Sequence, residues 1–226
     1  MPDIIFMLGL SDTCFKSAYL VKNILETNNM VSSCSYWSIS DYIDENVLPK
    51  ELFHGGLGLF TYGGIKKPSY NAYLLLKRLG KDVLKSGDGY YITRGENGEL
   101  RMIFYYYVPY NYEYSRQMDY QINMHSRDAF FRDREKKAFQ LQLSGFEGEY
   151  EEMRMELSPE SGSAFDFAKE SGNASFEEMD LDYLKQGSFM KRRYEKKKMT
   201  GLDYLTYELS PLEVLYVELW KTEGGH

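Results

Sequence analysis

The spacing of apolar residues changes near residue 87, from helical spacing to a period of two, and this change constrains the fold most. Ser11 and Asp12 are both suitable N-caps for a helix that ends near residue 28, and Pro68 suits the first turn of a second helix that Gly87 ends. Residues 30–40 are predicted to form a buried strand followed by a long polar loop. Helix, strand, loop and helix follow one another as in a parallel α/β fold, where such loops carry function.

From residue 89 onward, short runs of alternating apolar residues are separated by turn signals. Asn97-Gly98 predicts a hairpin turn, and Ser210-Pro211 separates the last two strands. Residues 137–157 alternate around glycine turns. One face of the aromatic run 104–114 is predicted to be core and the other to be covered by the helical segment, and the alternative is a carbohydrate-binding aromatic platform. Residues 159–188 are predicted as a loop excursion with one helix near 176–186. This half is therefore predicted to be an antiparallel β-sandwich, and the chain as a whole to be α+β.

Charge and hydropathy exclude several classes of protein. The 226 residues carry a formal net charge of −7, which argues against direct nucleic-acid binding because phosphates require a concentrated basic face. The basic run at 191–198 is predicted to be a solvated surface or a flexible loop. No apolar run approaches the roughly 20 residues that a membrane-spanning helix needs, and the first residues lack a basic leader and a cleavage site. A cytoplasmic location with no membrane partner is the resulting prediction.

The cysteines and histidines give no metal or disulfide signal. Cys14 and Cys34 belong to no CxxC pair and are predicted to be small buried residues. His125 has no carboxylate or cysteine at ligand spacing, and His226 is terminal. No metal or other cofactor is therefore predicted.

Three stretches together resemble a known family. "DTCFKSAYLVKNIL", "SYWSISDYIDEN" and "FHGGLGLFTYGGIKKPSYNAYLLLKRLG" are similar to the C-terminal part of family 39 glycoside hydrolases. That family includes β-xylosidases and the related modules of AraC-type bacterial transcription regulators. The resemblance covers residues 11 to about 86 and extends loosely into the later strands. It implies that residues 1–86 are the remnant of the C-terminal end of a (β/α)8 barrel and that residues 87–226 are a β-sandwich domain.

The resemblance also implies which catalytic groups to look for. The enzymes of the family retain configuration, which requires two carboxyl groups about 5 Å apart, and both are glutamates. The proton donor follows an asparagine, yet this chain has no Asn-Glu dipeptide, and the resemblance begins just beyond the place of the nucleophile. A complete barrel takes about 250 residues, and fewer than 90 precede the sandwich here. No catalytic residue is therefore assigned, and the chain alone is predicted to be inactive.

The resemblance does imply inherited sugar contacts. Trp37 corresponds to the indole that floors the sugar subsite, because sugar C–H faces pack on aromatic rings. Asp41, Asp44 and Glu45 match a region where the family places acidic residues near the sugar hydroxyls, to which carboxylates form strong hydrogen bonds. By the same resemblance, Phe53 and His54 line this pocket. The alternatives are a core tryptophan, a solvated loop or helix cap for the carboxylates, and a structural histidine. The predicted substrate-binding residues are Trp37, Asp41, Asp44, Glu45, Phe53 and His54.

Two functions follow from these observations. The first is the C-terminal fragment of a β-xylosidase-like enzyme of carbohydrate metabolism, with a xylose-type sugar or oligosaccharide as ligand. The second is a non-enzymatic sugar-sensing or interaction module related to those of AraC-type regulators. A barrel remnant exposes apolar surface, so the chain is expected to form a homo-oligomer or to bind a polypeptide that supplies the missing barrel half. Whether the chain is an enzyme stays open at this stage.

Overall fold

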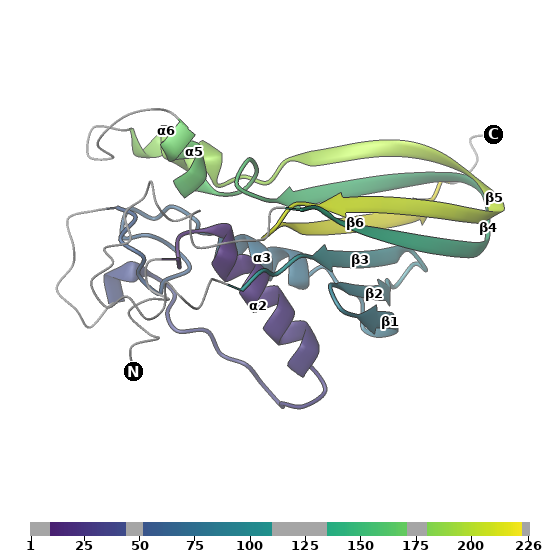
Figure 1. Ribbon diagram of the computed structural model, residues 1–226, viewed down its shortest axis with the longest axis horizontal. Coiled ribbons are helices and arrows are strands. Elements are labelled where there is room, and N and C mark those ends of the chain that lie inside the picture. Colours follow the sequence, from purple (N-terminus) through teal and green to yellow (C-terminus); the bar gives the residue numbers. More distant parts are fainter. Residues whose placement is uncertain (1–9, 44–51, 110–134, 171–179, 223–226) are drawn as a thin grey trace.

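The computed structural model describes residues 10–43, 52–109, 135–170 and 180–222 (Figure 1). Its helical elements are α2 (Cys14–Thr27), the 3-10 turn η1 (Asp41–Ile43), α3 (Pro68–Leu76), α5 (Ala164–Glu170) and α6 (Leu181–Gly187). Its strands are β1 (Asp82–Gly87), β2 (Tyr90–Arg94), β3 (Leu100–Tyr105), β4 (Lys137–Leu157), β5 (Arg192–Leu209) and β6 (Val214–Lys221). The six strands form one antiparallel sheet in the order β1-β2-β3-β6-β4-β5, which confirms the α+β class.

Helices α2 and α3 cover one face of the sheet, where they pack beside each other (Figure 1). Apolar side chains of both helices join those of β3, β4 and β6 in a single core cluster. Tyr107, just beyond β3, also contacts the rings of Phe15 and Tyr19 on α2, with ring centroids 5.6 and 5.9 Å apart. Tyr105 and Tyr107, on the side of the aromatic run that faces the helices, are therefore covered by the helical segment, as the alternation predicted. The buried members of this cluster are Ala18, Val21, Ala72, Leu75, Ile103, Tyr105, Met153, Met155, Leu157, Val214 and Tyr216.

The long hairpin of β4 and β5 covers the other face. Residues 150–157 of β4 pair with β6, whereas residues 137–144 pair with β5 alone and turn back over the sheet. Phe104 of β3 there meets Phe139 and Tyr207, with ring centroids 5.3 and 4.8 Å apart. The sequence predicted a sandwich of separate strands. The described strands instead form one sheet whose long hairpin folds over it, because β4 continues through the glycines that were predicted to be turns.

A β-bulge makes this fold-back possible. Between Ser144 and Glu147 the strand β4 advances three residues while β5 advances two. Because side chains alternate along a strand, one extra residue exchanges the faces. Odd-numbered residues of β4 face the hairpin core before the bulge, and even-numbered ones do so after it. Gly145 and Gly201 adopt φ values of 80° and 103° on the two strands, a conformation that favours glycine.

Residues 30–40 differ from the predicted buried strand. Met30 and Val31 are 80% and 50% exposed, and Cys34, predicted to be buried, is exposed, whereas Cys14 is buried as predicted. An apolar segment forms a strand only where a neighbouring segment supplies backbone hydrogen bonds. In the described part of the chain, only residues 38–41 find such a neighbour, in residues 57–60. The barrel remnant itself stays a prediction.

The second helix is shorter than predicted. Helix α3 begins at Pro68, as expected, but it ends at Leu76, and the predicted last turns form β1 instead. The chain turns at Gly80, where an added Cβ would lie 1.9 Å from the backbone oxygen of Arg94. The backbone approaches β2 so closely that only glycine fits, and this close approach directs the next residues into the sheet.

Several other elements agree with the predictions made from the sequence. Strands β2 and β3 form the hairpin around Asn97-Gly98, and β5 and β6 flank Ser210-Pro211. Within the basic run 191–198, residues 192–198 form the mostly exposed start of β5, where Lys196 and Lys198 lie opposite Glu151 and Glu149 on β4. The excursion before it holds two helices, α5 and α6, instead of one. The boundary at residue 87 stays a prediction, although β1 and a shared core cross it. No described helix is long and apolar enough to cross a membrane.

Candidate functional site

The candidate site is built around a lysine that is almost completely buried. Lys67, one residue before α3, places its Nζ 2.7 Å from Asp12 Oδ1 and 2.7 Å from Asp41 Oδ2. The same ammonium donates a hydrogen bond of 2.7 Å to the backbone oxygen of Gly56. The three charged side chains are at most 1% exposed. Buried charges persist where they are paired and hydrogen-bonded, and here two carboxylates satisfy one ammonium.

The two carboxylates also hold the loop that surrounds the lysine. Gly55 N–H donates to Asp12 Oδ2 at 2.6 Å, and Gly58 N–H donates to Asp41 Oδ1 at 2.7 Å. An added Cβ at Gly56 would lie 2.5 Å from Asp41 Oδ1, and one at Gly58 would lie 2.3 Å from the backbone nitrogen of Asp41. The glycines of this loop are thus required because the backbone wraps closely around Asp41.

Burial dominates the electrostatics of Asp41. Loss of water around its carboxyl raises the pKa, and the neighbouring Lys67 ammonium lowers it by a smaller amount. Ionised Asp12 acts in the same direction as burial, because two negative charges repel each other. Asp41 is therefore an acceptor committed to Lys67 and Gly58, with no exposed oxygen surface to offer to a ligand.

A short parallel pairing connects this cluster to the surface. Backbone hydrogen bonds join Ser38 to Leu57 and Leu59, and Phe60 accepts from the N–H of Asp41 at 2.9 Å. Trp37 precedes this pairing, joined to Ser38 by a cis peptide bond, and its side chain is 65% exposed. Tyr42 follows the pairing and is 72% exposed. The buried cluster therefore fixes a segment whose two ends present aromatic side chains to solvent.

The structure separates the predicted sugar contacts into different environments. Trp37 is exposed and Asp41 is buried. Phe53 lies in a core cluster, with its ring edge against Phe165 and the centroids 5.8 Å apart. His54 is partly buried, and its ring stacks on Tyr62 at 6.5 Å. Asp44 and Glu45 lie outside the described residues. The substrate-binding role of all six stays a prediction.

Sequence reasoning missed Asp12 and Lys67. Asp12 has the signature of a helix N-cap, and Lys67 follows Lys66, which is typical of a solvated pair. Nothing in their local sequence indicates burial, because the partners are 55 residues apart. The described residues contain no group of three or more His, Cys, Asp or Glu side chains that would hold a metal ion.

Residues 8–95 match the family model of glycosyl hydrolases family 39. A β-xylosidase from Geobacillus stearothermophilus is 34% identical over 94 residues, which are 42% of this chain and 19% of that protein. A β-xylosidase from Caldicellulosiruptor saccharolyticus is 38% identical over 69 residues, 30% of this chain and 14% of that protein. The chain thus spans less than a fifth of the length of these curated relatives.

Two solved structures share the fold over nearly the whole chain. A monomeric β-xylosidase from Caulobacter crescentus CB15 has a TM-score of 0.74 at 20% identity, covering 95% of this chain and 43% of that one. A GH39 enzyme from Xanthomonas axonopodis pv. citri has a TM-score of 0.71 at 15% identity, covering 94% and 42%. At such identities the likeness establishes the fold alone. The resemblance in the sequence is confirmed: the chain is related to glycosyl hydrolases family 39, and its partial coverage of these proteins fits the C-terminal part of such an enzyme.

Proposed function

We propose that the chain is the C-terminal part of a glycoside hydrolase for xylose-type sugars, and that it supplies one wall of the sugar site. The observation that carries this proposal is the exposed indole of Trp37, next to a segment fixed by the buried cluster of Asp12, Lys67 and Asp41. This region lies within the residues that match the family model. The wall thereby combines a stacking surface with a rigid support.

The chemistry of the wall suits stacking better than hydrogen bonding. An indole offers a flat face on which the C–H groups of a pyranose pack. A rigid support lowers the entropy lost on binding, because the backbone next to the ring is already held by hydrogen bonds from Ser38 onward. Asp41, by contrast, is proposed to act through the loop that it holds, since its oxygens contact Lys67 and Gly58.

Catalysis is proposed to require carboxyl groups from outside this chain. A retaining glycosidase needs one carboxylate to attack the anomeric carbon and a second carboxyl group to protonate the leaving oxygen. The two carboxylates of the buried cluster, Asp12 and Asp41, are both buried against Lys67. Neither can approach an anomeric carbon, so the chain alone is expected to bind sugar without hydrolysing it.

The test is a calorimetric titration of the chain with xylose and xylo-oligosaccharides, together with an aryl-xyloside hydrolysis assay. Binding heat is expected for the unmodified chain. It should be lost in Trp37→Ala and kept in Tyr204→Ala, which removes an aromatic ring of similar exposure, 56% against 65%, from β5. No heat at millimolar sugar would overturn the proposed sugar wall. Clear turnover by the chain alone would overturn the proposal that the catalytic groups lie elsewhere.

The alternative is a sugar-sensing module of the kind found in AraC-type regulators. The observation in its favour is the same burial of both carboxylates, which leaves a binding surface without a described catalytic group. Mixing the chain with a fragment of a family 39 β-xylosidase that lacks its own C-terminal part separates the two functions. Recovered hydrolysis supports the enzyme, and sugar binding without recovery favours the sensor.

A further inference from the structure

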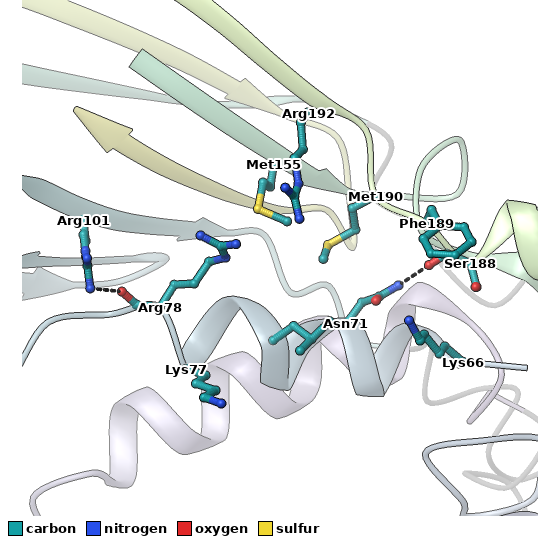
Figure 2. Close-up of a pocket in the computed structure, with 11 residues that line it drawn as sticks. Lys66, Asn71, Lys77, Arg78, Arg101, Met155, Ser188, Phe189, Met190 and Arg192 are labelled. Carbon is teal, nitrogen blue, oxygen red and sulfur yellow. Dashed lines mark hydrogen bonds between the residues drawn. The ribbon is translucent and has the colours of Figure 1, made fainter. Parts of the chain in front are cut away.

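A cavity of about 650 Å³ lies between α3, β3 and the neighbouring ends of β4 and β5 (Figure 2). We call it the basic groove, because five of its eleven lining residues are cationic and none is acidic. The groove does not include Trp37. Its cations come from the segment before α3, the end of α3, β3 and the first residue of β5: Lys66, Lys77, Arg78, Arg101 and Arg192.

Two of these cations are neutralised by acidic residues beside the groove. Arg101 contacts Glu99 at 2.6 Å and Glu218 at 3.3 Å, and it also donates to the backbone oxygen of Arg78. Arg78 lies 3.9 Å from the same Glu218. These contacts fix one end of the groove and leave little net charge there.

The other cations have no acidic partner within the described residues. Lys66 lies over the rings of Tyr70 and Phe189, with Nζ 5.3 and 5.1 Å from their centroids. Arg192 pairs across the sheet with Met155, whereas Lys196 and Lys198, farther along β5, lie opposite glutamates. Figure 2 shows Arg78 and Arg192 extending from opposite sides toward the same space. Because Arg78 shares Glu218 with Arg101, the positive charge of the groove that no described acidic residue offsets comes from Lys66, Lys77 and Arg192, in a chain whose net charge is −7.

Apolar surface lies beside these charges. Leu74, Met155 and Met190 line the groove, and the ring of Phe189 is 63% exposed. Asn71 is held in place by hydrogen bonds of 2.9 and 2.8 Å to the backbone oxygens of Gly162 and Ser188. A ligand that fits has anionic groups for the cations and an apolar face for the ring.

We propose that the basic groove binds an acidic oligosaccharide, a sugar chain that carries carboxylate groups. Guanidinium groups form bidentate hydrogen bonds with carboxylates, and the C–H face of a pyranose packs on an exposed aromatic ring. This proposal rests on the proposed role in sugar processing, and it adds to it a second, charge-selective binding site away from Trp37. The overall negative charge of the chain disfavours a long polyphosphate or a nucleic acid, whose binding depends on extended positive potential.

The test titrates the full chain with trigalacturonic acid and, separately, with tripolyphosphate at about physiological salt, and compares the two affinities. Trigalacturonic acid is expected to bind, and Arg192→Gln and Lys66→Gln are each expected to weaken it by about tenfold or more, the scale of one charge-assisted hydrogen bond. Phe189→Ala is expected to weaken trigalacturonic acid but not tripolyphosphate, which has no face to stack. Lys85→Gln, an exposed lysine on β1, is the control and should leave the affinity unchanged.

Three outcomes would overturn the proposal. The first is no binding of trigalacturonic acid, and the second is binding that Arg192→Gln and Lys66→Gln leave unchanged. The third is tighter binding of tripolyphosphate or of a single-stranded oligonucleotide, which would indicate a phosphate site. Trp37→Ala separates this proposal from the proposed function, because it should abolish the binding of xylo-oligosaccharides and leave that of trigalacturonic acid intact.

Discussion

Lys66 and Lys67 are adjacent in the sequence and have opposite environments in the structure. Lys66 borders the basic groove, whereas Lys67 is 1% exposed between Asp12 and Asp41. The difference follows from the backbone, which directs consecutive side chains before α3 to opposite sides. One of the two lysines therefore determines the stability of the site, and the other is available to a ligand.

Removing the buried ammonium tests this difference. Lys67→Met leaves two buried carboxylates without their cation, so the free energy of unfolding is expected to fall by about 3–5 kcal/mol. Lys66→Met is the matched control, with an expected loss of less than about 1 kcal/mol from its contacts with aromatic rings. Urea denaturation followed by circular dichroism measures both. Equal losses in the two variants would show that Lys67 does not hold the cluster together.

The raised pKa of Asp41 predicts a pH dependence with a definite sign. Burial makes the folded protein hold the Asp41 proton more tightly than the unfolded chain does. The difference in free energy of unfolding between the unmodified protein and Asp41→Asn is therefore greatest at about pH 4 and below, because the pKa of an aspartate in the unfolded chain is about 3.9. It falls as pH rises through the raised pKa and is constant above it. Denaturation of both proteins between about pH 4 and 8 measures this difference, and a rise with pH would mean that Lys67 outweighs burial.

At the scale of elements, α3 owes its position to long-range contacts. Its Pro68 and apolar residues predict a helix, and its short length leaves little intrinsic stability. Asn71 attaches the helix to two distant segments through the carbonyl groups of Gly162 and Ser188. Figure 2 shows the hydrogen bond to Ser188. A polar residue on the inner side of a short helix thus determines where the helix docks.

Asn71→Ala is expected to destabilise the protein, because two buried carbonyl oxygens lose their donor at a cost of about 1–3 kcal/mol each. Asn23→Ala in α2 is the control, since no hydrogen bond of its side chain is found among the described residues. The control should change stability by about 0.5 kcal/mol or less. Thermal unfolding compares the two, and a stable Asn71→Ala protein would contradict the anchoring role.

At the scale of the whole molecule, the segment around Trp37 exposes several large apolar side chains close together in the sequence. Met30, Ile39 and Tyr42 are 80%, 62% and 72% exposed, and more than half the length of the solved structures has no counterpart in this chain. Surfaces of this kind are normally covered by another part of the protein or by a second molecule. The isolated chain is therefore expected to associate.

Sedimentation velocity over a range of concentrations tests this expectation. The chain should form dimers or larger species, and Met30→Gln combined with Ile39→Gln should shift it toward the monomer. Leu202→Gln combined with Tyr204→Gln, which removes similarly exposed side chains from β5, is the control and should not. A monomer at every concentration would mean that this apolar segment buries itself in solution.

The family relationship, the α+β class and most strand positions could be predicted, because period-two alternation and turns such as Asn97-Gly98 are local signals. The candidate site was predicted only in part. Trp37 is exposed, and its stacking role stays a prediction, whereas Phe53 lies in a core and Asp41 in a buried ion cluster. Burial depends on which distant residues pack together, and no local pattern records it.

The sequence by itself determined helix α2, the start of α3, the hairpins and the family relationship of residues 8–95, since each depends on residues close together or on several motifs in a fixed order. Only the tertiary structure decided that 82–87 joins the sheet, that β4 runs through its glycines and folds over β3, and that Lys67 is buried while Arg192 lines the basic groove. Hydrogen-bond partners, close backbone approaches and charge pairing are made between residues far apart in the chain, so they exist only once the chain has folded.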